Sequence, residues 1–281
     1  MSRPEPRSEH ALIAAPAHLR PLVDRWVSYR HEGLEPGTHL GLPGSSLTLV
    51  LSLGRPTRVS TMPRAGDAPA EFDALVGGLH TSPAVIAYEQ ELSGVQLDLT
   101  PRGSRALLGL PAGELAGAVL SLQTLFGSRA SQQIERLREA PDWDTRFHLI
   151  TEMFTRQIGG LGQAPRALEE AWQTILCSGG RVRIADVAAR VGYSRRQLDV
   201  RFAREYGLAP KQLARIVRFE RSHRLLVANP RLTLAWIAAS CGYYDQAHMA
   251  RDWKQFAGCS PSSWLVREEL PFVQDQLGVG P

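Results

Sequence analysis

The feature that most constrains this fold is a unit that occurs twice in the last third of the chain. The copies read IADVAARVGYSRRQLDVRFAREYGLAP over Ile184–Pro210 and LAWIAASCGYYDQAHMARDWKQFAGCSP over Leu234–Pro261. In each copy a short segment with apolar residues at helical spacing ends at a Gly-Tyr pair, and a second such segment follows. A repeated unit of this kind is one supersecondary element used twice. The chain should therefore contain two similar pairs of helices.

Each copy predicts a helix-turn-helix. Gly192 and Gly242 supply the left-handed backbone conformation that ends a helix, and Ser194 and Asp245 can cap the helix that follows. The second helix of each copy carries an apolar pair at i, i+4 spacing, which places both side chains on one face. The pairs are Leu198 with Phe202, and Met249 with Trp253. A short helix, a glycine turn and a second helix with a polar outer face form a helix-turn-helix.

The charge of the chain is unevenly distributed. The 281 residues include 32 basic and 28 acidic ones, a net charge of only +4. Residues 178–267 hold 16 basic and 6 acidic residues, a charge of +10, whereas residues 1–177 hold 16 and 19, a charge of −3. Helical hairpins with a glycine turn also occur in proteins that never bind nucleic acid. Two copies in a strongly basic segment favour binding to a phosphate backbone.

The segment between the two copies predicts a connecting helix from about Lys211 to Ala228, roughly 27 Å long at about 1.5 Å per residue. Its apolar face consists of Leu213, Ile216, Val217, Leu225 and Leu226. With the width of the flanking units, such a spacer can hold two recognition helices about 34 Å apart, one turn of duplex DNA. Both helices could then enter successive major grooves on one side of the DNA.

The region before the repeat predicts a small β domain followed by helices. From about Pro16 to Arg102, glycine and proline interrupt the chain every few residues, and the apolar runs between them are typical of strands. Clear examples are Leu47–Leu53, Val85–Tyr88 and Val95–Leu99. Residues 104–159 then show helical spacing in three groups of apolar residues. The groups are Leu115, Val119 and Leu122; Ile134 and Leu137; and Phe147, Ile150 and Phe154. Gly159–Pro165 is the expected linker, and Arg166–Cys177 the next helix.

Residues Arg181–Trp264 resemble the AraC/XylS family of bacterial transcription regulators, which carry a tandem helix-turn-helix. The residues that carry the resemblance are Gly192-Tyr193-Ser194, Gly207-Leu208-Ala209-Pro210, Val217-Arg218-Phe219-Glu220-Arg221, Gly242-Tyr243, Asp245-Gln246-Ala247-His248 and Gly258-Cys259-Ser260-Pro261. Upstream, 94–103 and 107–112 are similar to the cupin-like domain of one branch of such regulators. In those relatives this domain binds small effectors or mediates dimerisation.

The resemblance implies an α+β protein: a β-rich cupin-like N-terminal domain with appended helices, and a C-terminal all-α domain of two helix-turn-helix units joined by a long helix. The expected divisions are 1–158 for the first domain, 159–180 for the linker and leading helix, 181–267 for the DNA-binding domain and 268–281 for a flexible tail. The implied function is sequence-specific binding to promoter DNA under control of the N-terminal domain, by effector sensing or self-association.

Carried over by position, the resemblance also implies the DNA-binding residues. They are Arg195, Arg196, Gln197, Arg201, Arg204 and Lys211 in and after the first unit, and Gln246, Ala247, His248 and Arg251 in the second. Val200 and Ala250 face the same way. Of the basic residues, Arg181, Arg204, Lys211 and Arg218 are assigned to phosphates or ion pairs. Many relatives carry arginine at the position of Val200. Here the arginine is Arg201, so base reading by the first helix is expected to rest on Arg196 and Gln197.

The partners implied are double-stranded DNA, with RNA polymerase, a small-molecule effector and a second copy of the chain as further candidates. Trp236 lies where relatives often carry a polar residue, and either packs against its own chain or forms a surface for RNA polymerase. No apolar run approaches the ~18 residues of a membrane span, and the first residues lack the apolar core of a signal peptide. We therefore expect a soluble, cytoplasmic protein.

Enzyme and metal sites are not supported by the residue pattern. His39 and His80 are isolated, with Glu89 and Glu91 nearby and no His-x-His motif, so we expect no metal, no cofactor and no catalytic residue. Cys177, Cys241 and Cys259 have no CxxC spacing and are expected to be buried thiols. Alkyl-transfer repair proteins are excluded because residues 1–176 contain no cysteine. The alternative to a regulator is a cupin-type enzyme or ligand-binding protein with an accessory basic domain.

Overall fold

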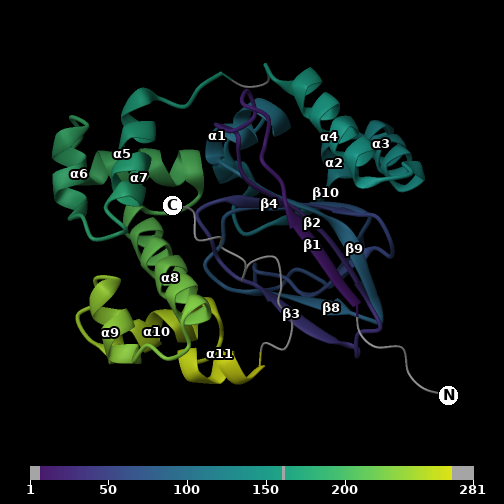
Figure 1. Ribbon diagram of the computed structural model, residues 1–281. Coiled ribbons are helices and arrows are strands. Elements are labelled where there is room, and N and C mark those ends of the chain that lie inside the picture. Colours follow the sequence, from purple (N-terminus) through teal and green to yellow (C-terminus); the bar gives the residue numbers. More distant parts are fainter. Residues whose placement is uncertain (1–6, 160–161, 268–281) are drawn as a thin grey trace.

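The computed structural model describes residues 7–159 and 162–267, and it has a β-rich N-terminal part and a helical C-terminal part (Figure 1). The strands are β1 (Arg7–Leu12), β2 (Val23–Glu32), β3 (Gly37–Gly41), β4 (Leu47–Ser52), β5 (Thr57–Thr61), β6 (Ala70–Phe72), β7 (Ala74–Gly77), β8 (Ala84–Tyr88), β9 (Glu91–Leu99) and β10 (Val119–Ser121). They form two antiparallel sheets, one in the order β1-β2-β9-β4-β7-β10 and one in the order β3-β8-β5-β6. The predicted α+β class is confirmed.

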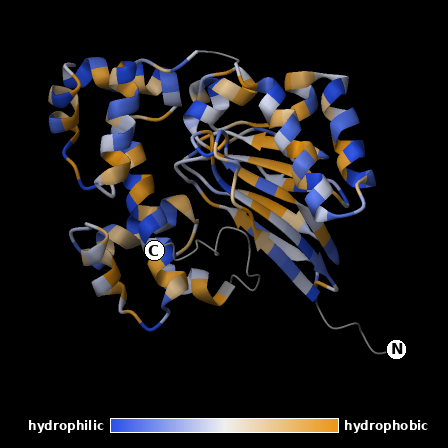
Figure 2. Ribbon diagram, turned by 45° about the horizontal axis from the view of Figure 1, so that its top comes forward, coloured by the Kyte–Doolittle hydropathy of each residue, from blue (hydrophilic) through white to orange (hydrophobic). Residues whose placement is uncertain are grey.

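The two sheets face each other, and strand alternation separates the two faces of the larger sheet. In β4, Leu49 and Leu51 belong to the main apolar core, whereas Thr48 and Val50 line a small cavity between the sheets. Side chains point alternately to opposite faces of a strand. The larger sheet therefore buries one face against the second sheet and its other face against helices. Figure 2 shows apolar strands beneath those helices.

Helices cover the second face of the larger sheet. They are α1 (Pro101–Gly103), the single-turn helices η1 (Ser104–Leu108) and η2 (Ala112–Leu115), and then α2 (Leu122–Phe126), α3 (Ser128–Glu139) and α4 (Trp143–Gln157). Of the apolar residues predicted for α3 and α4, Ile134, Leu137, Ile150 and Phe154 are each at most 3% exposed, and Phe147 is half-buried.

One expectation for this region is wrong. Val119 was predicted to share a helical face with Leu115 and Leu122, but it begins β10, which pairs antiparallel with β7. The reason is local, because Gly117 adopts φ +69°, a left-handed conformation that interrupts a helix after η2. The chain then extends along the free edge of β7.

The C-terminal part consists of α5 (Arg166–Cys177), α6 (Ile184–Arg190), α7 (Arg195–Tyr206), α8 (Pro210–Ala228), α9 (Leu234–Ser240), α10 (Gln246–Phe256) and α11 (Pro261–Arg267). The bounds of α5 are the predicted ones, and α8 is the predicted connecting helix. The expected tail from residue 268 and residues 160–161 of the linker lie outside the described residues.

The local chemistry of both repeats is as the sequence predicted. Gly192 and Gly242 have φ values of +74° and +80°. The Ser194 hydroxyl accepts a hydrogen bond from the Gln197 amide, and the Asp245 carboxylate accepts one from the His248 amide, at 3.2 and 2.6 Å. The apolar pairs of α7 and α10 are fully buried. The α6–α7 and α9–α10 pairs are therefore two copies of one helix-turn-helix.

The cysteines follow the prediction in two cases of three. Cys241 and Cys259 are buried, whereas Cys177 is exposed at the end of α5. The buried face of α5 is formed by Leu168, Ala171, Trp172 and Ile175. Cys177 lies two residues after Ile175, on the opposite side of the helix, so the expectation of a buried thiol is wrong at this position. Among the described residues, every helix falls short of the length or the apolar character that crossing a membrane requires.

The His80 imidazole provides a titratable probe of the N-terminal domain. Burial lowers the pKa of His80 to about 4, and a hydrogen bond between Nδ1 and the Ser82 carbonyl oxygen, at 2.6 Å, acts in the opposite direction. The folded state therefore favours the neutral ring. Above the unfolded pKa of about 6.5 the group has no effect, and as the pH falls from there toward 4 it lowers the free energy of unfolding.

We predict that His80→Gln makes the stability of the protein less sensitive to acid between pH 6.5 and 4. Urea unfolding of wild type and variant at several pH values measures this difference. Parallel pH profiles for the two proteins would contradict the assignment.

Candidate nucleic-acid interface

The outer faces of α7 and α10 present side chains that no other part of the described structure uses. Arg196 on α7 and Gln246 and Arg251 on α10 are exposed and form no hydrogen bond or ion pair with any described residue. Ala247 is exposed beside Gln246, and Lys211 is exposed at the start of α8. Arginine and glutamine in such positions can make paired hydrogen bonds to guanine and adenine.

Other predicted DNA-binding residues are partly committed to their own helices. The Gln197 side chain closes a capping box, its Oε1 accepting from the Ser194 amide at 2.9 Å. Arg195 lies 3.9 Å from Asp199, and the guanidinium of Arg201 stacks over the Tyr193 ring. These contacts fix the N-terminal end of α7. Arg196 is exposed and is less constrained than these three side chains.

His248 of α10 and Val200 of α7 differ in how far their own chain constrains them. His248 packs edge-on against Tyr243 and lies 3.4 Å from the Tyr244 amide, so its ring is held close to the turn. Val200, at the position where many relatives carry arginine, is 64% exposed on α7. An exposed aliphatic side chain at this position can contact a thymine methyl group but cannot donate a hydrogen bond.

A buried ion pair fixes α10 against α8. Asp252 on the inner face of α10 is 2% exposed and accepts from Nε and Nη2 of Arg215, at 3.0 and 2.7 Å. Arg215 also donates to Gln255, and its guanidinium stacks over the Phe256 ring. A carboxylate buried in this way is stable only with its partner in place. The pair therefore sets the orientation of α10 relative to α8.

Aromatic side chains also pack α10 against α8. Trp253 lies edge-on against Phe219 of α8, and its indole Nε1 donates to the Ser222 hydroxyl at 2.9 Å. Ser222 in turn donates to the Phe219 carbonyl oxygen at 2.8 Å. The hydrogen bonds satisfy the polar atoms of an otherwise apolar contact, so α8 and α10 form one rigid body.

The helix α7 of the first unit is held from a different direction, by the N-terminal domain. Glu205, near the end of α7, receives two hydrogen bonds from Arg105 of η1, at 2.6 and 2.7 Å. Both side chains are largely buried, at 8% and 13% exposure. Next to the pair, the Gly113 backbone lies so close that a Cβ there would be 2.3 Å from the Arg204 carbonyl oxygen. The C-terminal end of α7 is thus docked on η2, while its N-terminal end stays exposed.

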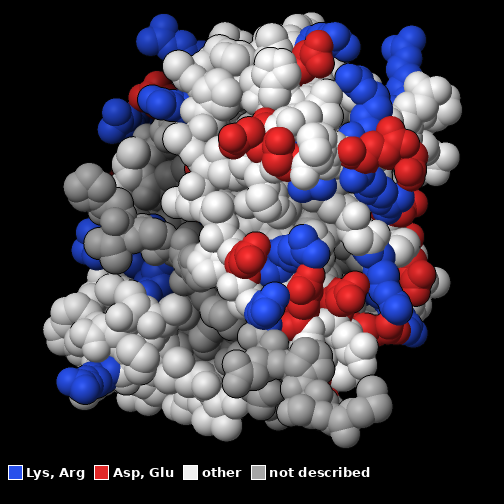
Figure 3. Space-filling model, turned by 45° about the vertical axis from the view of Figure 1, so that its right-hand side comes forward, with Lys and Arg blue, Asp and Glu red and all other residues white. Residues whose placement is uncertain are grey.

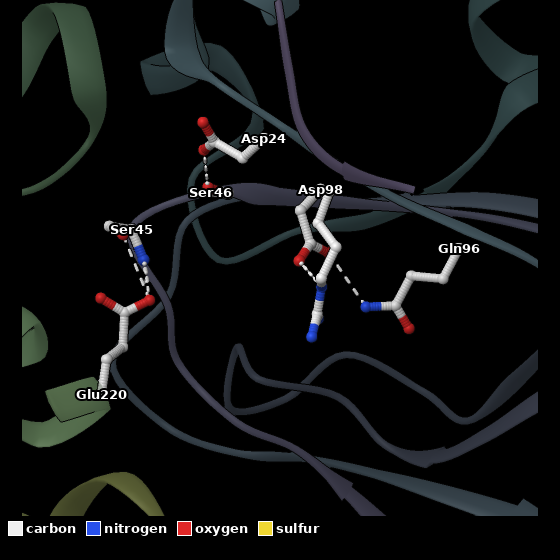
Figure 4. A network of polar contacts seen from close by, with 7 residues as sticks. Asp24, Ser45, Ser46, Gln96, Asp98 and Glu220 are labelled. Carbon is white, nitrogen blue, oxygen red and sulfur yellow. Dashed lines mark hydrogen bonds and ion pairs between the residues drawn. The ribbon is translucent and has the colours of Figure 1, made fainter. Parts of the chain in front are cut away.

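A second contact joins the two parts at α8. The Glu220 carboxylate accepts from the amide and hydroxyl of Ser45, at 2.9 and 3.2 Å. Figure 4 shows this contact beside two further polar clusters, the Ser46–Asp24 hydrogen bond and the Arg25–Asp98 ion pair. Burial raises the pKa of Glu220, and the Ser45 hydrogen bonds oppose that rise. Each domain contact therefore pairs a carboxylate of the helical part with a donor of the β-rich part.

Two of the four residues assigned to phosphates or ion pairs, Arg181 and Arg218, make contacts within the structure. Arg218 donates to the Gly180 carbonyl oxygen at 2.8 Å and lies over the Tyr243 ring, and Arg181 donates to the Ser178 carbonyl oxygen. Trp236 does not pack away into its own chain, because half of its surface stays exposed on α9. Figure 3 shows acidic and basic side chains intermixed over the N-terminal half, unlike the basic composition of residues 178–267.

The anchoring residues were missed from the sequence, although a signal was present. Glu205 follows the buried Phe202 by three residues, and Asp252 follows the buried Met249 by three. A carboxylate at helical spacing from core residues must face inward. The spacing alone thus predicts a buried partner, but it cannot identify Arg105, which lies 100 positions away.

Comparisons with known proteins agree with this architecture. A family model described as a helix-turn-helix domain matches residues 187–267. The Msm operon regulatory protein of Streptococcus mutans serotype c is 34% identical over 92 residues, which are 33% of this chain and 32% of that protein. The chain spans about a third of the length of this curated relative, and the matched helix-turn-helix domain lies in the C-terminal part of the chain.

Solved structures share the fold of most of the chain. ToxT from Vibrio cholerae O395 matches with a TM-score of 0.51 and 12% identity, covering 86% of this chain and 97% of that chain. ToxT from the same strain bound to (E)-4-(8-methylnaphthalen-1-yl)but-3-enoic acid matches with a TM-score of 0.52 and 13% identity, covering 85% and 97%. The fold of most of this chain is therefore also found in ToxT.

We predict that Asp252→Ala lowers the free energy of unfolding by about 3 kcal/mol, because it leaves Arg215 partly buried without its partner. Urea denaturation followed by tryptophan fluorescence measures the loss. Asp245→Ala, which removes only the cap of the same helix, is the matched control and should lose about 1 kcal/mol. Equal losses for the two variants would contradict the anchoring role.

Proposed function

We propose that this protein is a sequence-specific DNA-binding transcription regulator. The observation that carries the proposal is the pair of helix-turn-helix units with exposed cationic and amide side chains on the second helix of each. The net charge of +10 over residues 178–267 supports the proposal, as does the helix-turn-helix family model that matches residues 187–267. The curated relative is named an operon regulatory protein, which also supports it. We assign the chain no catalytic activity.

In the proposed complex, α7 and α10 lie in successive major grooves of promoter DNA. The connecting helix α8 has 19 residues, a length of about 28 Å at 1.5 Å per residue. Arg196 reads a base from α7, and Gln246, Ala247 and Arg251 read bases from α10. Arg204 and Lys211 are exposed and contact phosphates, which position the protein without selecting sequence.

The N-terminal domain, residues 1–158 in this proposal, controls DNA binding by sensing a small molecule or by self-association. A ToxT structure with the same overall fold contains a bound organic acid. The Arg105–Glu205 and Ser45–Glu220 contacts connect the N-terminal domain directly to α7 and α8. For RNA polymerase, the exposed Trp236 on α9 is the proposed contact.

A salt titration tests the function as a whole. Binding of a duplex through several phosphate contacts should weaken steeply as salt rises, because bound counterions are released from the DNA. Fluorescence anisotropy of a labelled promoter fragment measures the affinity. A flat salt response, or no binding at low salt, would contradict the proposal.

We predict that Arg196→Ala and Arg251→Ala each weaken binding to the specific site by about 1–3 kcal/mol, five- to 150-fold, while binding to random duplex changes less. The specific site comes from genome-wide mapping of bound fragments. Arg58→Ala, at an exposed arginine of β5, is the matched control and should leave both affinities unchanged. Equal losses on specific and random DNA would assign these arginines to phosphates.

A further inference from the structure

Two connections join the two helix-turn-helix units. The first is α8, which runs from the α6–α7 pair to the α9–α10 pair (Figure 1). The second is the loop of residues 178–183, between α5 and α6, which contacts both α8 and the turn of the second unit. Long helices curve along their length, so α8 by itself leaves the angle between the units variable. A second contact, away from the axis of α8, restricts that angle.

The loop is packed closely against α8 and against the second turn. Gly180 has a φ of +72°, and a Cβ there would lie 2.1 Å from the carbonyl oxygen of Ala214 on α8. Gly242, in the turn between α9 and α10, has a φ of +80°, and a Cβ there would lie 2.5 Å from Cγ of Arg181. Both approaches leave no room for a side chain, so each requires a glycine.

Arg218 of α8 contacts the loop and the second turn at the same time. Its Nη1 donates a hydrogen bond to the Gly180 carbonyl oxygen at 2.8 Å, and its guanidinium lies over the Tyr243 ring, 5.5 Å from the ring centre. Tyr243 is itself buried, and its ring packs edge-on against His248 of α10. One side chain thus connects the loop to the turn from which α10 begins.

The loop is fixed to the first unit because α5 packs on α7. The ring of Trp172 on α5 lies 5.7 Å from that of Phe202 and 4.4 Å from that of Tyr206, measured between ring centres. At the end of α5, the Gly180 amide donates to the Ile175 carbonyl oxygen at 3.0 Å. The arginine on α8 therefore couples a segment fixed to α7 with a segment fixed to α10.

The direction of the Arg218 side chain disfavours a phosphate contact. Its Nε is buried, and the hydrogen bond and the ring contact of its guanidinium are both internal to the protein. An arginine that binds the DNA backbone must reach outward to the duplex. Arg224, later on the same helix, is exposed instead.

From these contacts we propose that Arg218 is a positioning residue that fixes α10 relative to α7. It thereby sets the spacing that the protein accepts between the two DNA segments that these helices contact. One extra base pair moves two such segments apart by about 3.4 Å and rotates them by about 35° around the duplex axis. Helices held in one relative orientation cannot follow this change. The proposal rests on the regulatory function proposed above and names the residue that determines its spacing requirement.

Duplexes with altered spacing test the proposal. Fluorescence anisotropy compares the specific site with versions in which one base pair is inserted or deleted between the two segments. Wild type should bind the original spacing at least tenfold more tightly than either altered one. Arg218→Met and Arg218→Lys should each reduce this ratio below threefold. Lysine keeps the charge but lacks the planar group that lies over Tyr243 while it donates to Gly180.

Arg224→Met removes the same charge from an exposed position of α8 and is the matched control. It should keep the wild-type ratio, with any loss of affinity equal for all three duplexes. The same pattern for Arg218→Met, with rescue by Arg218→Lys, would assign Arg218 to a phosphate and overturn the proposal. An unchanged ratio in both Arg218 variants, or equal binding of all spacings by wild type, would also overturn it. Circular dichroism checks folding, and Arg218→Lys decides if Arg218→Met is unfolded.

A distance measurement in the free protein tests the role of Arg218 without DNA. Val200 on α7 and Lys254 on α10 are exposed. Nitroxide labels on Val200→Cys and Lys254→Cys, in a Cys177→Ser background, report the distance between the two helices. The distance distribution should be at least twice as wide with Arg218→Met as without it, and unchanged with Arg224→Met. An equally narrow distribution would overturn the proposal. If the protein binds no duplex, the regulatory function fails, and this measurement still decides the positioning role.

Discussion

The bidentate ion pair between Arg105 and Glu205 determines how the two halves of this protein are arranged. It joins a turn of the N-terminal domain to the first recognition helix, and both partners are largely withdrawn from solvent. A buried carboxylate without its partner is strongly unfavourable, so the two groups hold the halves together wherever the linker runs. The close backbone contact between Gly113 and Arg204 adds a steric fit beside the charge.

The second helices of the two units, α7 and α10, are consequently held by different parts of the chain. Asp252 ties α10 to Arg215 within the helical domain, and aromatic side chains of α8 and α10 pack beside that pair. Glu205 ties α7 to the β-rich domain instead. A rearrangement of η1 therefore acts on α7 directly, whereas α10 is joined to α8. In the proposed complex, where both helices enter the DNA, such a relative displacement changes the fit to the duplex.

Much of this organisation follows from the sequence because it is set by local rules. The glycine turns, the caps of α7 and α10, the buried i, i+4 pairs and the bounds of α5 depend on residues close together in the chain. Val119 shows the limit of that reasoning. It has helical spacing from Leu115 and Leu122, yet it lies in a strand that pairs with β7, where Val119 is opposite Gly77. Spacing along the chain does not reveal a partner 42 positions away.

In the candidate site, too, local features followed from the sequence and contacts between distant segments did not. The exposure of Arg196 and Arg251 follows from which face of each helix is apolar. Gln197 was expected to read a base, but its spacing from Ser194 is that of a capping box, and its side chain accepts from the Ser194 amide. The anchors Arg105 and Arg215 needed coordinates, because an ion pair between distant segments leaves no spacing pattern.

The position of Cys177 has a practical consequence for measuring these motions. It is the exposed one of the three thiols, and it ends α5, whose Trp172 packs against Phe202 and Tyr206 of α7. A maleimide fluorophore would therefore attach to the native chain at one defined place, next to the helix that the N-terminal domain holds. Energy transfer from that dye to a labelled duplex would report the approach of α7 to DNA without any engineered cysteine.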